Sequence, residues 1–167
     1  MKIVLLWIGF VLCIAGGMLL QGISPGVLLQ PTAALIVLLP VLLYLLYCHG
    51  SGLPGFVSRL FKQELQETDL ATLDTAVSLG FVFGAISMVS GMVMTMANLS
   101  DSSKLGAGIA VSFISAIYGA VPAVLLLPLR NNSKSTKNSS IKAGGYMAVT
   151  AFMLATNVVT VLYALGR

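Results

Sequence analysis

The segment Ala76–Ala97 reads AVSLGFVFGAISMVSGMVMTMA, and it gives the clearest indication of the fold. It contains no charged residue and has the length of a helix that crosses a membrane, which needs about 20 predominantly apolar residues. Its small residues recur at steps of three and four, which is the spacing of one face of an α-helix. The stretch therefore predicts a transmembrane helix with one face of small side chains.

Apolar stretches of similar character lie on both sides of this one. Hydrophobic residues make up 57% of the chain and charged residues 8%, against about 25% charged in an average soluble domain. We predict an all-α, polytopic helical membrane protein with about five transmembrane helices, forming a single membrane domain over residues 1–167. The second span is short as an apolar run, and Val27–Leu29 extend it to residues 27–47. The expected spans are Ile3–Leu20, Ala33–Tyr47, Ala76–Ala97, Leu105–Leu129 and Gly145–Leu165.

The positive charges predict the orientation of these spans, because basic loops stay on the cytoplasmic side. The link before the second span has no charge, whereas the link at residues 48–75 carries Arg59 and Lys62 among four acids. The flexible link at residues 130–143 has four basic residues and no acid. We therefore expect the N-terminus and these two links inside and the C-terminus in the periplasm. Membrane lipid is an expected contact of the basic link, and nucleic acid is not.

Two alternatives concern individual segments. Met1–Gly22 resembles a signal peptide in its lysine and apolar core, but no A-x-A pattern follows, so we expect an uncleaved first helix. Ser58–Asp74 is expected to form a short helix on the cytoplasmic face, either as an interfacial connector or as a docking element for a partner.

Two faces of small residues are the most informative pattern in the chain. In lipid, helices associate where small residues let their backbones approach closely, so both faces are expected to meet another helix. The hydroxyl groups either serve this packing or line a narrow polar path. Asn157 of the fifth span is expected to hydrogen-bond across a helix contact. The two faces consist of Gly80, Gly84, Ser87, Gly91 and Thr95, and of Gly108, Ser112, Ser115, Gly119 and Pro122.

No Asp, Glu, Lys or Arg lies within any expected span. Ionisable groups inside a membrane mark proton relays and ion pathways. If this chain conducts protons, the carboxylate must therefore come from another subunit. One histidine and two cysteines provide neither a metal cluster nor a nucleophilic dyad, and no phosphate loop is present. We predict no cofactor and no enzyme activity.

The segment from Asn98 to Gly119, which reads NLSDSSKLGAGIAVSFISAIYG, resembles the MotA family of flagellar stator subunits. In that family a similar external loop leads into a helix that ends near a Tyr-Gly pair, and a proline then follows towards the cytoplasm. Pro128 is in a comparable place. Gly16-Gly17 and Leu29-Gln30-Pro31 also resemble the start of these proteins.

The resemblance implies a function and partners. MotA-like proteins, with the related TolQ and ExbB proteins, form rings of typically five copies around a single-span, MotB-like partner in the inner membrane. An aspartate of that partner carries the proton or sodium ion. By resemblance Ser115 faces the pore, and Pro128 is a candidate coupling proline. The candidate pore or ring-interface residues are Gly84, Ser87, Gly91, Thr95, Ser112, Ser115 and Gly119.

The chain departs from the family pattern in four respects. Ala116 replaces a threonine, the third span contains no proline, the link at residues 48–75 is short, and a fifth span is added. We therefore carry two functions forward. The first is a ring-forming ion-channel subunit that couples ion flow to mechanical work. The second is a non-conducting accessory or structural membrane protein with a MotA-like core. A small-solute transporter has less support, because no charged or broken-helix site is expected at mid-membrane.

Overall fold

The computed structural model describes residues 2–98, 102–131 and 143–166. These residues form helices and turns, with no strand among them, so the predicted all-α class is confirmed. Residues 99–101 of the external loop and residues 132–142 of the basic link lie outside the described residues. The helices are α1 (Lys2–Leu20), α2 (Pro31–His49), α3 (Leu53–Lys62), α4 (Glu67–Ala97), α5 (Ser102–Asn131) and α6 (Ala143–Leu165), with 3-10 turns η1 (Pro25–Leu28) and η2 (Gly50–Gly52).

Three helical segments are long and apolar enough to cross a membrane, as judged by length and composition. They are Pro31–Lys62, Glu67–Ala97 and Leu105–Asn131, and shorter apolar helices cover Val4–Leu20 and Ala148–Tyr163. Large apolar side chains are widely exposed on the helices, as expected of a surface that faces lipid. The chain is therefore an integral membrane protein, while the boundaries of five spans stay a prediction.

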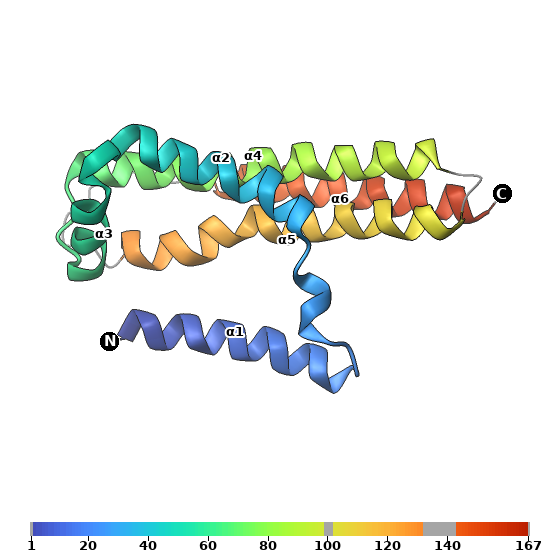
Figure 1. Cartoon of the computed structure of the whole chain (residues 1–167), viewed down its shortest axis with the longest axis horizontal. Coiled ribbons are helices and arrows are strands. Elements are labelled where there is room, and N and C mark those ends of the chain that lie inside the picture. Colours follow the sequence, from blue (N-terminus) through green and yellow to red (C-terminus); the bar gives the residue numbers. More distant parts are fainter. Residues whose placement is uncertain (1, 99–101, 132–142, 167) are drawn as a thin grey trace.

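α4 and α5 form the centre of the molecule. They run side by side over most of their length and make the most extensive contact between any two described helices (Figure 1). α2 packs on both of them, and α6 also contacts both. α1 lies apart from this bundle, reaches α5 over a few residues and is joined to α2 through η1 (Figure 1). The small-residue faces thus belong to the two central helices.

The second helix begins later than we expected. Val27 and Leu28 lie in η1 and Leu29 follows it, so Val27–Leu29 do not lengthen α2, which starts at Pro31. Proline has no N–H and disfavours the helical conformation in the residue before it, which makes it a natural first residue of a helix. A polar contact holds this link, because the Tyr118 hydroxyl donates to the Leu28 carbonyl at 3.0 Å.

The expected helix over Ser58–Asp74 is divided in two. α3 ends at Lys62, and Gln63 follows in the left-handed conformation with φ of 61°. A new helix, α4, starts directly after Gln66. The Gln66 side chain accepts a hydrogen bond from the Asp69 N–H, and the Asp69 side chain accepts one from the Gln66 N–H. This reciprocal cap satisfies two backbone donors that would otherwise lack partners. The residues Glu67–Asp74 are therefore the first two turns of a long α4.

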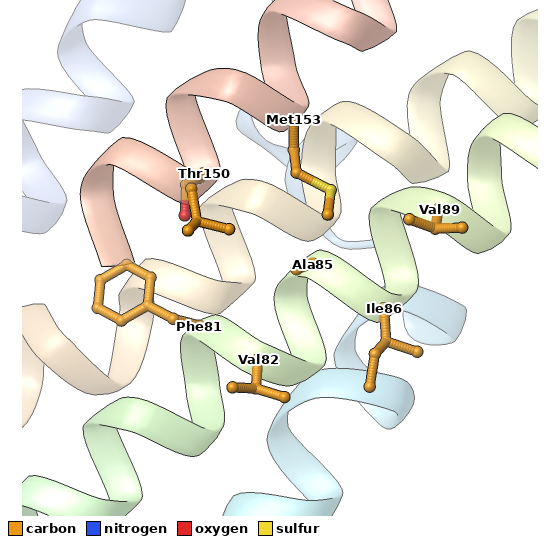
Figure 2. Close-up of a pocket in the computed structure, with 8 residues that line it drawn as sticks. Phe81, Val82, Ala85, Ile86, Val89, Thr150 and Met153 are labelled. Atoms are coloured by element: carbon orange, nitrogen blue, oxygen red, sulfur yellow. The ribbon is translucent and has the colours of Figure 1, made fainter. Parts of the chain in front are cut away.

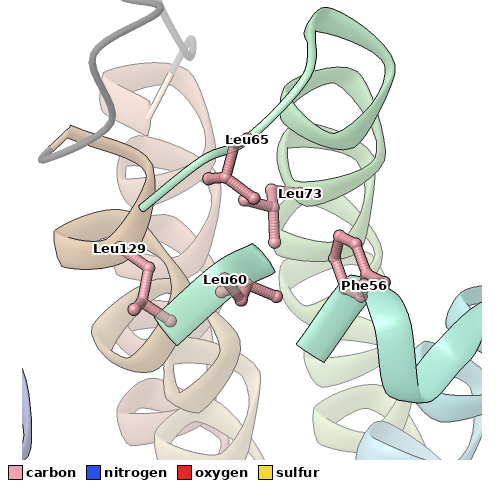
Figure 3. Close-up of a cluster of buried hydrophobic side chains, with 5 residues drawn as sticks. All are labelled: Phe56, Leu60, Leu65, Leu73 and Leu129. Atoms are coloured by element: carbon pink, nitrogen blue, oxygen red, sulfur yellow. The ribbon is translucent and has the colours of Figure 1, made fainter. Parts of the chain in front are cut away.

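A small apolar cluster fixes α3 against the bundle (Figure 3). Phe56 and Leu60 of α3 pack with Leu73 of α4 and Leu129 of α5, and Leu65 of the connecting turn completes the cluster. Trp7 of α1 also packs against this cluster, and its ring meets the Phe61 ring edge-on at a centroid distance of 6.1 Å. α3 therefore links the starts of α1 and α4 with the end of α5.

Candidate functional site

The two small-residue faces pack directly on one another within the chain. All ten residues of the two faces are buried. A Cβ atom placed on Gly91 would lie 2.6 Å from the Ser112 nitrogen, and one on Gly84 would lie 2.8 Å from the Gly119 Cα. Such distances leave no room for a side chain, so the absence of one at these glycines permits the close approach of the helices. We call this contact the α4–α5 interface.

Hydroxyl groups form a buried polar row along the α4–α5 interface. The Oγ atoms of Ser87 and Ser115 lie 2.7 Å apart, and both side chains are fully buried. Ser115 also donates to the Val111 carbonyl, so its one proton is used and Ser87 donates to Ser115. Thr95 donates to the Gly91 carbonyl of its own helix at 3.0 Å. These hydroxyls are satisfied within the chain.

Ser112 connects three helices. Its hydroxyl donates to the Met88 carbonyl of α4 at 3.0 Å and accepts a hydrogen bond from the Asn157 amide of α6. Both Ser112 and Asn157 are buried, at 0% and 2% exposure. The expectation that Asn157 hydrogen-bonds across a helix contact is confirmed. The sequence did not indicate its partner, since many hydroxyls lie on the facing helices.

Two ion pairs lie at the α3 end of the bundle. Arg59 of α3 donates from Nε and Nη2 to the two carboxylate oxygens of Asp69, each at 3.0 Å. Arg130, near the end of α5, contacts Asp74 of α4, with Nε and Oδ1 2.6 Å apart. Sequence reasoning assigned these arginines to topology alone and missed both pairs. The signal was the placement of Asp69 and Asp74 within the two turns that precede the apolar part of α4 at Ala76.

The structure places the candidate residues as follows. Gly84, Ser87, Gly91, Thr95, Ser112, Ser115 and Gly119 all lie in the α4–α5 interface. Pro128 lies elsewhere, in a groove lined by Phe10 and Cys13 of α1. Pro122, not singled out as a coupling residue, has its ring against Gly80 on the α4–α5 interface. A pore or ring-interface role of the seven residues, and a coupling role of Pro128, stay predictions.

Comparisons with known proteins identify the part of the chain that contains this interface. The sequence model described as the MotA/TolQ/ExbB proton channel family matches residues 58–143, just over half of the chain. The match covers α4 and α5 and ends where α6 begins. The chain belongs to the MotA/TolQ/ExbB proton channel family.

A relative supports the same assignment. Motility protein A of Aquifex aeolicus (strain VF5) is 33% identical to this MotA/TolQ/ExbB family member over 79 residues. The aligned region is 47% of this chain and 31% of that relative, so the chain spans under a third of the relative's length. No solved structure matches the chain. The predicted family resemblance is thus confirmed, and the family-matched part of the structure is the α4–α5 pair with the second half of α3.

Proposed function

We propose that this chain is a subunit of an ion channel that forms a ring of several copies and conducts protons or sodium ions together with a single-span, MotB-like partner. The observation that carries this proposal is the coincidence of the family match with the α4–α5 interface. The most extensive contact between described helices, with its buried row of hydroxyls, lies in the part that the family shares. By resemblance to MotA-like proteins, the expected ring contains five copies of the chain.

The distribution of carboxylates supports a requirement for a partner. Asp69 and Asp74 are held by Arg59 and Arg130 at the α3 end, before the apolar part of α4. The apolar stretch from Ala76 to Ala97 and the facing stretch from Leu105 to Leu129 contain no acid. A carboxylate that exchanges ions at mid-membrane must therefore belong to another chain. We propose a single apolar span with one aspartate.

The test is the composition of the complex purified from bacterial membranes in mild detergent. Native mass spectrometry of the tagged chain is expected to give a ring of several copies, most simply five, with a single-span protein whose membrane segment contains an acid. A preparation that contains one copy and no such protein contradicts the proposal. In membrane vesicles, uptake of protons or sodium ions is expected only when both proteins are present.

A second candidate function is a non-conducting accessory or structural protein. The observation that favours it is the internal bonding of the hydroxyls, because Ser87, Ser112 and Ser115 are each fully buried and bonded within the chain. Hydroxyls used in this way stabilise helix packing without contacting an ion.

Ser115→Ala separates the two candidates, because it removes one hydroxyl and adds no volume. A conducting interface predicts that ion uptake falls while the number of copies in the complex is unchanged. A purely structural interface predicts that assembly and phenotype change together, as with Gly91→Ala. Thr156→Val is the matched control, since the exposed Thr156 hydroxyl donates to the Phe152 carbonyl of its own helix.

A further inference from the structure

α6 differs from the other helices in how it is attached. Most of its described side chains are exposed, including Phe152 at 73% and Val159 at 65%. Among the described side chains of α6, Asn157 alone is buried. Burying an amide in an apolar bundle is costly unless it is hydrogen-bonded, and here it donates to Ser112. A buried polar contact therefore ties α6 to α5.

α6 covers one side of the α4–α5 interface and α2 covers the other. Figure 2 shows α4 between α6 and α2, with Phe81 and Ala85 directed towards Thr150 and Met153 of α6. On α5, Ser112 bonds to α6, whereas Tyr118 bonds to Leu28 just before α2. Ser112 and Tyr118 are six positions apart in the sequence. At 3.6 residues per turn, this separation places them about 120° apart around the helix. The two contacts are thus on different sides of α5.

On the side of the α4–α5 interface that α6 covers, Ser112 is the hydroxyl that bonds to another helix. Its backbone lies against Gly91, and its oxygen reaches both Met88 of α4 and Asn157 of α6. Ser87 and Ser115 bond to each other instead. With α6 in place, Met88 and Ser112 are both 0% exposed. A carboxylic acid on a neighbouring helix reaches Ser112 only after Asn157 has left it.

We propose that α6 is an intramolecular cover of the α4–α5 interface: its Asn157–Ser112 hydrogen bond occupies the position that an acidic partner helix uses when the channel is active. The proposal rests on the proposed channel function for its second half. Asparagine has the shape of aspartate but does not ionise near neutral pH, so it binds the serine without being able to carry an ion. The covered form is therefore inactive, and the partner competes with α6.

A groove between α4 and α6 makes such a movement compatible with the packing. It has a volume of about 470 Å³ and is lined almost entirely by apolar side chains, among them Val82, Ile86 and Val89 of α4. The contact of α6 with α4 and α5 is much smaller than that of α4 with α5. Apolar surface exposed when α6 moves is covered by lipid, which is as apolar as the side chains it replaces.

Cross-linking measures the covered form in the chain without any partner. The variant carries Ala85→Cys and Met153→Cys, which line the same groove (Figure 2), in a background with Cys13→Ala and Cys48→Ala. We expect the pair to form an oxidative cross-link. Adding Asn157→Leu, which keeps the volume and removes the donor, is expected to lower the cross-linking rate by about threefold or more. Thr156→Val is expected to leave the rate unchanged.

The same variant tests whether the cover controls activity. In vesicles that contain the complete complex, oxidation of the cysteine pair is expected to lower ion uptake at least about tenfold, and reduction to restore it. A helix that only stabilises the fold gives uptake that does not change on locking, which overturns the proposal. A cross-linking rate that is insensitive to Asn157→Leu also overturns it. If no variant conducts, the channel function fails, and the cross-linking rates still decide whether α6 is held by Asn157.

Discussion

At the level of single residues, the glycines of α4 determine how closely α5 approaches. Gly91 lies against the backbone of Ser112, and Gly84 lies against the backbone of Gly119. Backbone atoms cannot move aside as the end of a flexible side chain can. Any Cβ at these positions therefore separates the helices and weakens the hydrogen bonds between them.

Gly91→Ala is expected to lower the free energy of unfolding by about 1–3 kcal/mol, as overpacking of a close contact does. The measurement is unfolding by dodecyl sulfate in mixed micelles, followed by circular dichroism. Gly106→Ala on α5 is the matched control, because a Cβ there has no atom within 4 Å. Equal stability of the two variants contradicts the close approach of α4 and α5 at Gly91.

The bond between Ser87 and Ser115 is expected to show energetic coupling. In a double-mutant cycle with Ser87→Ala and Ser115→Ala, the coupling energy is expected to be about 1 kcal/mol, which is typical of a hydrogen bond between membrane helices. The same unfolding assay measures it. Additive effects of the two substitutions would contradict the hydrogen bond between these hydroxyls, whose oxygens lie 2.7 Å apart.

Among the described charged residues near α3, Asp69 has the most hydrogen bonds. It accepts two hydrogen bonds from Arg59 and one from the Gln66 N–H, and it is 1% exposed. Asp69→Asn removes the charge while keeping the size, and is expected to cost about 1.5–3 kcal/mol of stability. Thermal unfolding in detergent measures the loss. Glu67→Gln, exposed in the same turn, is expected to change stability by less than about 0.5 kcal/mol.

At the level of helices, α3 is held by apolar packing together with the Arg59–Asp69 ion pair. The apolar part of its contact with α4 and α5 comes from Phe56 and Leu60, while Val57 and Phe61 remain exposed at 41% and 54%. His49, at the end of α2, stacks on the Phe56 ring with a centroid distance of 4.0 Å. Phe56 thus joins α2, α3 and α4.

Phe56→Ala is expected to release α3 from the bundle, because truncating a buried phenylalanine costs about 3–5 kcal/mol. Hydrogen exchange of the α3 amides, measured by mass spectrometry, is expected to speed up while exchange in α4 and α5 stays slow. Val57→Ala, on the exposed side of the same helix, is the control. Faster exchange throughout all helices would mean that α3 is part of one cooperative unit with the interface.

The sequence predicts these elements unevenly, for physical reasons. The period of small residues predicted which faces of α4 and α5 meet a helix, because close backbone approach requires glycine and serine in that register. It did not predict that the two faces meet each other, since a stripe of small residues carries no information on its partner. The division between α3 and α4 was also missed. It depends on the Gln66–Asp69 cap, whose signature lacks the usual serine or threonine.

At the level of the whole molecule, the packing places α3 and the ends of α1, α4 and α5 at one end of the bundle (Figure 1). Arg59, Lys62 and Arg130 lie at this end. The predicted cytoplasmic position of residues 48–75 and of Arg130 and Asn131 is compatible with this arrangement, because α3 and the end of α5 lie at the same end of the bundle. The orientation itself stays a prediction.

The orientation can be tested with single cysteines. In a background with Cys13→Ala and Cys48→Ala, Lys62→Cys is expected to react with a membrane-impermeant maleimide in inverted vesicles and not in intact spheroplasts. Ile23→Cys, in the link between α1 and α2, is expected to show the opposite pattern because its link carries no positive charge. The reverse pattern for both positions would place the basic residues outside and contradict the predicted topology.

The absence of side chains between Gly84 and Gly119, and between Gly91 and Ser112, has a mechanical consequence. Two helices in backbone contact at several levels cannot slide or twist against each other without a clash at every level. α4 and α5 therefore move as one rigid pair of helices. A force applied at the α3 end is transmitted along this pair to the opposite side of the membrane. Any bending must occur in the helices attached to the pair, because α1 and α6 each contact it over few residues.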